Sequence, residues 1–298
     1  MIHYQIEKEK KRFWIGEKEF LPEYELKTES VFAQCNGYMG VRAAHPFSLI
    51  EEQRGMFLSG AFNKAYEGEV TELVNCPDVT WFGLEIDGEK IYPERSCLKS
   101  FERKLDIFSG ELVIHYVFDL GEKGEVLVEN RRFASMAQTN LFAQSLRVQF
   151  LDGRNRQVKI KTGINGQMTN SGVSHFHTST ARVYDKEIME IRSELENSTV
   201  TEAVGCKVVC GVQEEKEFNL KRRSVYGTYV VTPEDKEVIF EKVTFADQGE
   251  DGITTEERKQ ALATALKKGY DVLLEEQQAK MKEFWDVTRV HVDGMSEA

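Results

Sequence analysis

The chain has 298 residues, with 50 acidic and 39 basic side chains and a formal net charge of −11. This balance argues against a surface for nucleic acids or anionic membranes, and no apolar run approaches the length of a membrane helix. Hydrophobic residues make up 41% and aromatic residues 10%, which is typical of a soluble globular protein with one large or two ordinary domains.

From the N-terminus to about residue 245, short apolar runs alternate with polar residues and turn signals. Asp87-Gly88 and Asp152-Gly153 are two such turns. Many short strands at this spacing predict a mainly β protein built on a large antiparallel β-sandwich. Strand-like segments lie at 2–6, 79–86, 90–92, 111–118, 126–128, 142–150, 158–160, 173–184, 207–212, 225–231 and 238–245.

The periodicity becomes helical after a polar, glycine-containing segment at 247–252. Thr254 followed by Glu257 predicts a capping box, in which each side chain satisfies a free backbone N–H of the other. One helix is expected to end at Gly269 and a second to begin at Tyr270. The second helix carries an apolar stripe that the sandwich or a further domain must cover. The stripe consists of Leu273, Leu274, Met281, Phe284 and Trp285.

The stretch ESVFAQCNGYMGVRA, residues 29–43, holds two short apolar runs, one of them at 31–33, on either side of Asn36-Gly37. Because Asn and Gly tolerate positive φ, this pair predicts a tight hairpin. Gly40 would let another group approach the backbone closely. Arg42 offers donors suited to a carboxylate, a phosphate or sugar hydroxyls. From this chemistry alone, the stretch predicts a structural hairpin with one buried ion pair.

Other polar residues do not assemble into an active site. His175 and His177 would share a strand face, but they lack a third ligand, so a solvated or hydrogen-bonded pair is expected rather than a metal site. Asp78 and Asp106 are expected to cap turns or pair with an arginine. Of Arg131-Arg132, one residue should be exposed and the other paired inside, because consecutive strand residues point in opposite directions.

The five cysteines are odd in number and irregularly spaced, which argues against a disulfide framework. Cys206 and Cys210 are predicted to share one apolar strand face, roughly 13 Å apart and too far to form a bond. The N-terminus has no apolar segment behind its charges, so a signal peptide is not expected. These observations predict buried free thiols in a reducing, cytoplasmic compartment.

No phosphate-binding loop, nucleophile elbow, dinucleotide fingerprint or zinc spacing is present. An independent carbohydrate-binding module is one alternative, but it needs an exposed aromatic platform. The tryptophans are Trp14, Trp81 and Trp285, and Trp81 falls in a segment predicted to be core. A plain structural or dimerisation domain is another alternative.

Several segments, taken in order, resemble glycoside hydrolase family 65, which contains maltose, kojibiose, nigerose and trehalose phosphorylases and related hydrolases. The chain departs from the family pattern at Cys35 and Ala43, where glycine is usual. The matching segments are Glu29-Ser30, Asn36 to Arg42, Glu72 to Asn75, Pro77-Asp78, Arg103, Leu105-Asp106, Gly110, Arg132 to Ser135, and the helix from Gly269-Tyr270 to Trp285.

The resemblance implies a supersandwich of the galactose-mutarotase-like type over 1–248 and a helical linker over 249–298. The linker would lead to a catalytic (α/α)6 barrel absent from this chain. In the family, the general acid and the phosphate site lie in that barrel, so no catalytic residue, metal or cofactor is expected here. The parent reaction would be inverting phosphorolysis of an α-glucosyl disaccharide, with inorganic phosphate as co-substrate. A hydrolase of the same family is the alternative.

By the same resemblance, the sandwich is expected to pack against the barrel, to shape the rim of the sugar pocket and to join two subunits in a homodimer. The chain alone would then be inactive. The candidate rim or barrel-facing residues are Asn36, Gly37, Tyr38 and Arg42.

Overall fold

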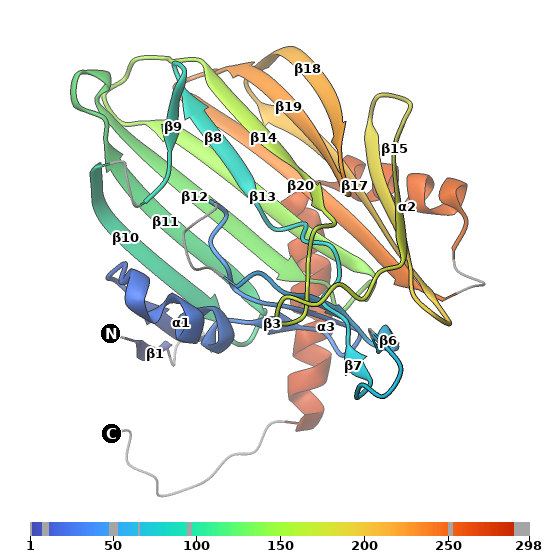
Figure 1. Ribbon diagram of the computed structural model, residues 1–298. Helices are drawn as coiled ribbons and strands as arrows, with labels where there is room; N and C mark the ends of the chain where they lie inside the picture. Colours follow the sequence, from blue (N-terminus) through green and yellow to red (C-terminus); the bar gives the residue numbers. More distant parts are fainter. Residues whose placement is uncertain are drawn as a thin grey trace, which may run out of the picture.

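A ten-stranded antiparallel sheet is the largest element of the protein (Figure 1). The computed structural model describes residues 2–7, 12–47, 53–64, 66–93, 97–249 and 253–288. The order of strands in the large sheet is β1-β2-β10-β11-β12-β13-β20-β17-β16-β15. Their bounds are β1 (His3–Glu7), β2 (Arg12–Glu17), β10 (Cys97–Asp106), β11 (Glu111–Asp119), β12 (Glu125–Ala134), β13 (Leu141–Phe150), β15 (Thr178–Tyr184), β16 (Ile188–Glu194), β17 (Thr199–Cys210) and β20 (Glu237–Gln248).

A five-stranded antiparallel sheet, in the order β18-β19-β14-β8-β9, covers one face of the large sheet (Figure 1). Side chains from both sheets form one hydrophobic core. Phe240 of the large sheet, for example, meets Tyr229 and Phe82 of the small sheet, with ring centroids 4.8 and 6.3 Å away. The predicted antiparallel β-sandwich is confirmed. The small sheet contains β8 (Phe82–Ile86), β9 (Glu89–Ile91), β14 (Val158–Asn165), β18 (Val212–Lys221) and β19 (Ser224–Thr232).

Helix α1 (Glu25–Val31) occupies part of a segment that the sequence suggested was strand-like. The run at 31–33 ends this helix instead of forming a hairpin strand. The helix buries Glu25, Thr28 and Glu29 at helical spacing, so its inward face is polar and gives no apolar helical signal. The remaining short elements are η1 (Pro22–Tyr24), η2 (Gly121–Lys123), β3 (Gln34–Cys35), β4 (Met39–Val41), β5 (Met56–Leu58), β6 (Phe62–Asn63) and β7 (Glu72–Leu73).

Two helices, α2 (Thr255–Lys268) and α3 (Tyr270–Thr288), pack on the face of the large sheet opposite the small sheet. The predicted capping box forms between Thr254 and Glu257. Only the first half of α3 buries side chains, and Figure 1 shows its second half continuing past the sheets. Among the described residues, no helix is long and apolar enough to cross a membrane. The helices and sheet share a second core of Phe133, Leu141, Ala143, Ile188, Ala203, Val243, Phe245, Leu262, Ala265, Tyr270, Leu273 and Leu274.

A register shift in β17 corrects the prediction for its two cysteines. Cys206 lies opposite Lys242 on the inner face, but the shift between Val208 and Cys210 places Cys210 opposite Ile239 on the other face. The prediction that Cys206 and Cys210 share a face is therefore wrong, because one extra residue reverses the alternation. The free cysteines among the described side chains are Cys35, Cys76, Cys206 and Cys210.

Two strand glycines of the small sheet provide a matched test of the fold. A Cβ at Gly163 would lie 2.1 Å from the carbonyl oxygen of Val225 and 2.6 Å from the Cα of Tyr226, both backbone atoms. At Gly83 the nearest atom, Lys161 Cβ, would lie at an ordinary 3.5 Å. We expect Gly163→Ala to lower the free energy of unfolding by about 1–3 kcal/mol or more, and Gly83→Ala to leave it nearly unchanged. Urea unfolding of both variants checks this, and equal losses would contradict it.

Candidate functional site

The hairpin between β3 and β4 is closed by the side chain of Asn36. Its Oδ1 accepts hydrogen bonds from the backbone N–H groups of Tyr38 and Met39, at 3.0 and 2.7 Å. Its Nδ2 donates to the carbonyl oxygens of Ser135 and Thr139, at 2.7 and 2.9 Å. The predicted tight hairpin is confirmed, and the buried amide of Asn36 fixes it to the end of the large sheet.

The other turn residues lie closer to the surface. Gly37 has φ +86°, a backbone conformation that favours glycine, and space around it is open. The hydroxyl of half-buried Tyr38 accepts a hydrogen bond from the backbone N–H of Gln248, at 3.1 Å. A Cβ at Gly40 would meet nothing within 4 Å, so the predicted close approach to Gly40 is wrong.

The guanidinium of Arg42 is occupied by the protein itself. It donates to the carbonyl oxygens of Gln53 and Leu26, at 2.8 and 3.0 Å, and to Glu29 Oε2 at 3.3 Å. The Glu29 side chain is fully buried, and its burial raises its pKa. The structure thus contains the structural hairpin and ion pair that the sequence predicts, whereas a role of Asn36, Gly37, Tyr38 and Arg42 at a substrate rim stays a prediction.

Amide side chains join this hairpin to helix α3. Gln34 Nε2 donates to the carbonyl oxygens of Gly110 and Arg132, at 2.7 and 2.8 Å. Gln277 of α3 donates to the carbonyl oxygen of Ser109 and accepts from the N–H of Met136, at 2.9 and 2.6 Å. Segments that are distant in sequence therefore meet here. We name Gln34, Asn36, Gly110, Ser135 and Gln277 the hairpin seam.

Beside the hairpin, the guanidinium of Arg103 is buried among polar side chains. Its Nε donates to Glu17 Oε1 at 2.7 Å, and its Nη2 donates to Thr28 Oγ1 at 2.7 Å. Glu25 lies 3.3 Å from Nη2 and also bonds His45 Nε2 at 2.7 Å. Burial lowers the pKa of His45 to about 4, so this imidazole is neutral near pH 7. The cluster joins β2, α1 and β10 through their side chains.

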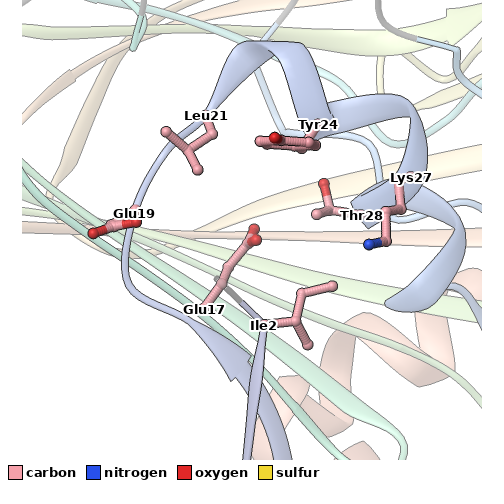
Figure 2. A pocket seen from close by; sticks show the side chains of 7 residues that line it. All are labelled: Ile2, Glu17, Glu19, Leu21, Tyr24, Lys27 and Thr28. Atoms are coloured by element: carbon pink, nitrogen blue, oxygen red, sulfur yellow. The ribbon is translucent and has the colours of Figure 1, made fainter.

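A cavity of about 450 Å³ opens above this cluster (Figure 2). Glu17 and Thr28 contribute polar groups to it, but both already accept hydrogen bonds from Arg103. Burial raises the pKa of Glu17 despite the neighbouring guanidinium. These two groups therefore serve the internal network rather than a substrate. The lining residues are Ile2, Glu17, Glu19, Leu21, Tyr24, Lys27 and Thr28.

Charged groups are also buried between the two sheets. Arg132 and Lys242 lie in one cross-strand row with Gln144 between them. Lys242 Nζ donates to Thr162 Oγ1 at 2.7 Å, and burial lowers its pKa to about 8. Among the described residues, the side-chain nitrogens of Arg132 have no hydrogen-bond partner, and burial lowers its pKa to about 10. No described group donates a hydrogen bond to either carboxylate oxygen of Glu202, and burial raises the pKa of this carboxyl well above its ordinary value.

The prediction that one of Arg131 and Arg132 is exposed and the other is paired inside is therefore half right. Arg131 is partly exposed and pairs with Glu111 and Asp271, at 2.8 and 3.0 Å. Arg132 points inside, but no carboxylate of the described part of the chain pairs with it there, so the prediction that it is paired is wrong. Strand alternation predicted that one of the two arginines is buried, but it carried no information about which one or about the groups opposite it.

The two predicted aspartates hold local turns. Asp78 accepts from the N–H of Thr80 at 2.8 Å and pairs with Arg54 at 3.4 Å. Asp106 accepts from the N–H of Phe108 at 3.0 Å. The prediction that each aspartate caps a turn or pairs with an arginine is confirmed, because Asp78 does both and Asp106 caps a turn.

The histidine pair lies in a loop before β15 rather than on a strand. His175 is buried with its Nε2 3.2 Å from Glu72, whereas His177 is exposed. The prediction that both imidazoles share a strand face is wrong, because the strand begins only at Thr178. Within the described ranges, no group of three His, Cys, Asp or Glu side chains could hold a metal ion.

The two fully buried arginines should respond differently to the same substitution. Arg103→Met leaves Glu17 and Glu25 buried without their cation, so we expect a loss of about 3–5 kcal/mol in the free energy of unfolding. Arg132→Met removes a buried charge that makes no hydrogen bond or ion pair with the described residues, so we expect unchanged or higher stability. Chemical denaturation of both variants measures the difference. A loss in Arg132→Met as large as that in Arg103→Met would contradict this account.

The buried carboxyl of Glu202 should make stability depend on pH. The pKa of Glu202 is raised in the folded state, whereas the pKa of a free glutamate side chain is about 4.3. Above that pH the unfolded chain releases the proton and the folded chain retains it, so the group costs stability as the pH rises. We expect Glu202→Gln to raise the melting temperature at pH 8 and to change it little at pH 4. The exposed control Glu67→Gln should show neither effect, and equal shifts of Glu202→Gln at both pH values would refute the mechanism.

Known proteins match most of this chain. A sequence profile of the glycosyl hydrolase family 65 N-terminal domain matches residues 15–284. The kojibiose phosphorylase of Escherichia coli K12 is 29% identical, over 90% of this chain and 36% of its own length. The kojibiose phosphorylase of Halothermothrix orenii is 29% identical, over 98% of this chain and 40% of its own length. The chain thus spans about two-fifths of the length of these curated relatives.

The fold is also shared with a solved structure. A provisionally named kojibiose phosphorylase from the human microbiome superposes with a TM-score of 0.80 at 16% identity, covering 91% of this chain and 38% of that chain. At this identity the likeness concerns the fold alone. The profile match, by contrast, extends from β2 into the second half of α3. The chain belongs to glycosyl hydrolase family 65, as the family's N-terminal domain.

Proposed function

We propose that this chain is the non-catalytic N-terminal domain of a cytoplasmic α-glucoside phosphorylase whose catalytic barrel belongs to the same polypeptide. The parent reaction is inverting phosphorolysis of an α-glucosyl disaccharide to β-glucose 1-phosphate and a sugar. A carboxylic acid in the barrel protonates the leaving oxygen while inorganic phosphate attacks the opposite face of the glucosyl ring. The relatives named kojibiose phosphorylases, at 29% identity, support this reaction over hydrolysis by water.

The observation that carries the proposal is the half-covered helix α3. Leu273 and Leu274 of the predicted stripe pack on the large sheet, and Trp285 rests on Phe108 with ring centroids 5.5 Å apart. Phe284, however, is 43% exposed, and Val287 is 86% exposed. Apolar side chains in this position favour a further surface that covers them.

The ribbon of β6 and β7 also exposes apolar side chains. Phe62, Tyr66 and Val70 are exposed on it, and Figure 1 places the ribbon and the second half of α3 at one end of the sandwich. We name Phe62, Tyr66, Val70, Phe284 and Val287 the apolar end. Gln277 of α3 belongs to the hairpin seam and lies beside this end, where it donates a hydrogen bond to the carbonyl oxygen of Ser109. The barrel would therefore cover the apolar end and bring the Asn36–Arg42 turn towards its rim.

The hydrogen bonds and ion pairs of two buried carboxylates support a non-catalytic role. Glu17 accepts from Arg103, and Asp78 is held by Arg54 and Thr80. A general acid must instead be able to reach a leaving-group oxygen. The proposal accordingly assigns this chain the tasks of packing against the barrel and positioning loops at the pocket rim. Homodimerisation is a secondary task that the same apolar end could serve.

A chimera tests the proposal directly. The purified chain should release no glucose 1-phosphate from kojibiose and phosphate. Grafted in place of the matching N-terminal part of the Escherichia coli kojibiose phosphorylase, it should support phosphorolysis. Phe284→Asp should lower the activity of the chimera at least tenfold, because an unpaired carboxylate would be buried against the barrel.

The matched control is Leu220→Asp, which changes an equally apolar side chain on β18 that is 55% exposed and away from α3. It should leave the activity of the chimera unchanged. Two results would overturn the proposal: phosphorolysis or hydrolysis by the 298-residue chain alone, or a Phe284→Asp chimera as active as its parent. Sedimentation of the chain over a range of concentrations reports separately on dimerisation.

A further inference from the structure

The outer face of the small sheet contains a hollow that the proposed function does not use. Gly83 on β8 lies opposite Lys161 on β14, which in turn lies opposite Thr228 on β19. Because Gly83 has no side chain, the face is open between its neighbours. A cavity of about 540 Å³ lies there, bordered also by Trp81 and Tyr92. This volume is in the range of small-molecule sites.

A second cavity, of about 490 Å³, continues from the first. Trp81 and Lys161 line both cavities. We name the two together the sheet groove. The second cavity is lined by Arg54, Asp78, Trp81, Lys161, Asn165, Gln167, Lys221, Arg222, Ser224 and Tyr226.

The sheet groove is basic in an acidic protein. Its two acidic residues are already paired, Asp78 with Arg54 at 3.4 Å and Glu85 with Lys159 at 3.2 Å. The remaining lysines and arginine leave an excess of positive charge on a chain whose formal net charge is −11. A local field of this sign attracts an anionic ligand. The basic residues of the groove are Arg54, Lys90, Lys159, Lys161, Lys221 and Arg222.

Aromatic and amide groups stand beside these cations. Lys161 Nζ lies 3.8 Å from the ring centroid of Tyr226. Trp81 comes directly before β8, whose Phe82, Leu84 and Ile86 are buried as the segment predicted to be core requires, but Trp81 itself is only half-buried and lines the groove. Its partly exposed indole offers an apolar surface on which a sugar ring can pack. Asn165 and Gln167 supply further polar groups.

We propose that the sheet groove binds a phosphorylated monosaccharide. The phosphate lies in the basic half, near Lys161, Lys221 and Arg222, and the sugar ring lies over Gly83 against Trp81. A bare anion would use only the cations, and a neutral sugar would leave them unpaired, whereas a sugar phosphate uses both sets of groups. The site lies on the sandwich itself and does not require the barrel.

Calorimetric titration of the purified chain tests the proposal with glucose 1-phosphate, inorganic phosphate and glucose as separate probes. We expect glucose 1-phosphate to bind at least tenfold more tightly than either of the others. Equal binding of inorganic phosphate would reduce the groove to a bare anion site and overturn the proposal. Equal binding of glucose would show that the groove is a neutral carbohydrate surface, which would also overturn the proposal. The absence of binding by glucose 1-phosphate would overturn it as well.

Two variants locate the ligand. Gly83→Leu fills the floor of the groove without a backbone clash, and Lys161→Met removes a central cation while retaining an apolar chain. Each should weaken glucose 1-phosphate binding at least tenfold. The control Lys207→Met, at an exposed lysine on β17, should not change it. Unchanged binding in both groove variants, with native circular dichroism, would place the ligand elsewhere. If the sheet groove binds no glucose 1-phosphate, the expected activity of the chimera does not change. The groove proposal and the proposed function can therefore fail independently.

Discussion

The buried guanidinium of Arg103 is the contact on which the position of the hairpin depends. It holds Glu25 and Thr28 on one side of helix α1, and Glu29 on the same helix holds Arg42 at the base of the hairpin. A buried guanidinium loses much of its desolvation cost when its donors are satisfied, so moving the partners of Arg103 away would cost stability. The ionic cluster therefore determines where α1 lies, and α1 determines where the hairpin lies.

Much of the sandwich could be predicted because its signals are local. Alternating apolar residues marked β11, β13 and β20, and the capping box marked the start of α2. Several of the elements that escaped prediction lack an apolar face that alternates along the sequence. Helix α1 buries acids, β10 buries Arg103, and β18 is an edge strand of almost entirely exposed residues. Their partners lie far away in sequence, so no local pattern could identify them.

In the candidate sites, too, some features have a local sequence signal and others have none. Asn36-Gly37 signalled a hairpin by its own conformational preferences, and the structure adds that the Asn36 amide is anchored to Ser135 and Thr139. The sheet groove gave no signal, because its lining comes from several separate segments that each look like ordinary strand or turn sequence. The segment that contains Trp81 was predicted to be core because its residues are apolar, and this pattern could not show that Trp81 itself is partly open to the groove.

The arrangement of layers keeps the two proposed surfaces apart. Helices α2 and α3 cover one face of the large sheet, and the small sheet covers the other. The sheet groove lies on the outer face of the small sheet, so both sheets of the sandwich stand between it and α3. A barrel docked on the apolar end would bury Phe284 and Val287 without having to cover Gly83 or Lys161. The sandwich can therefore support a catalytic partner at one end and still present a charged groove to small molecules on its far face.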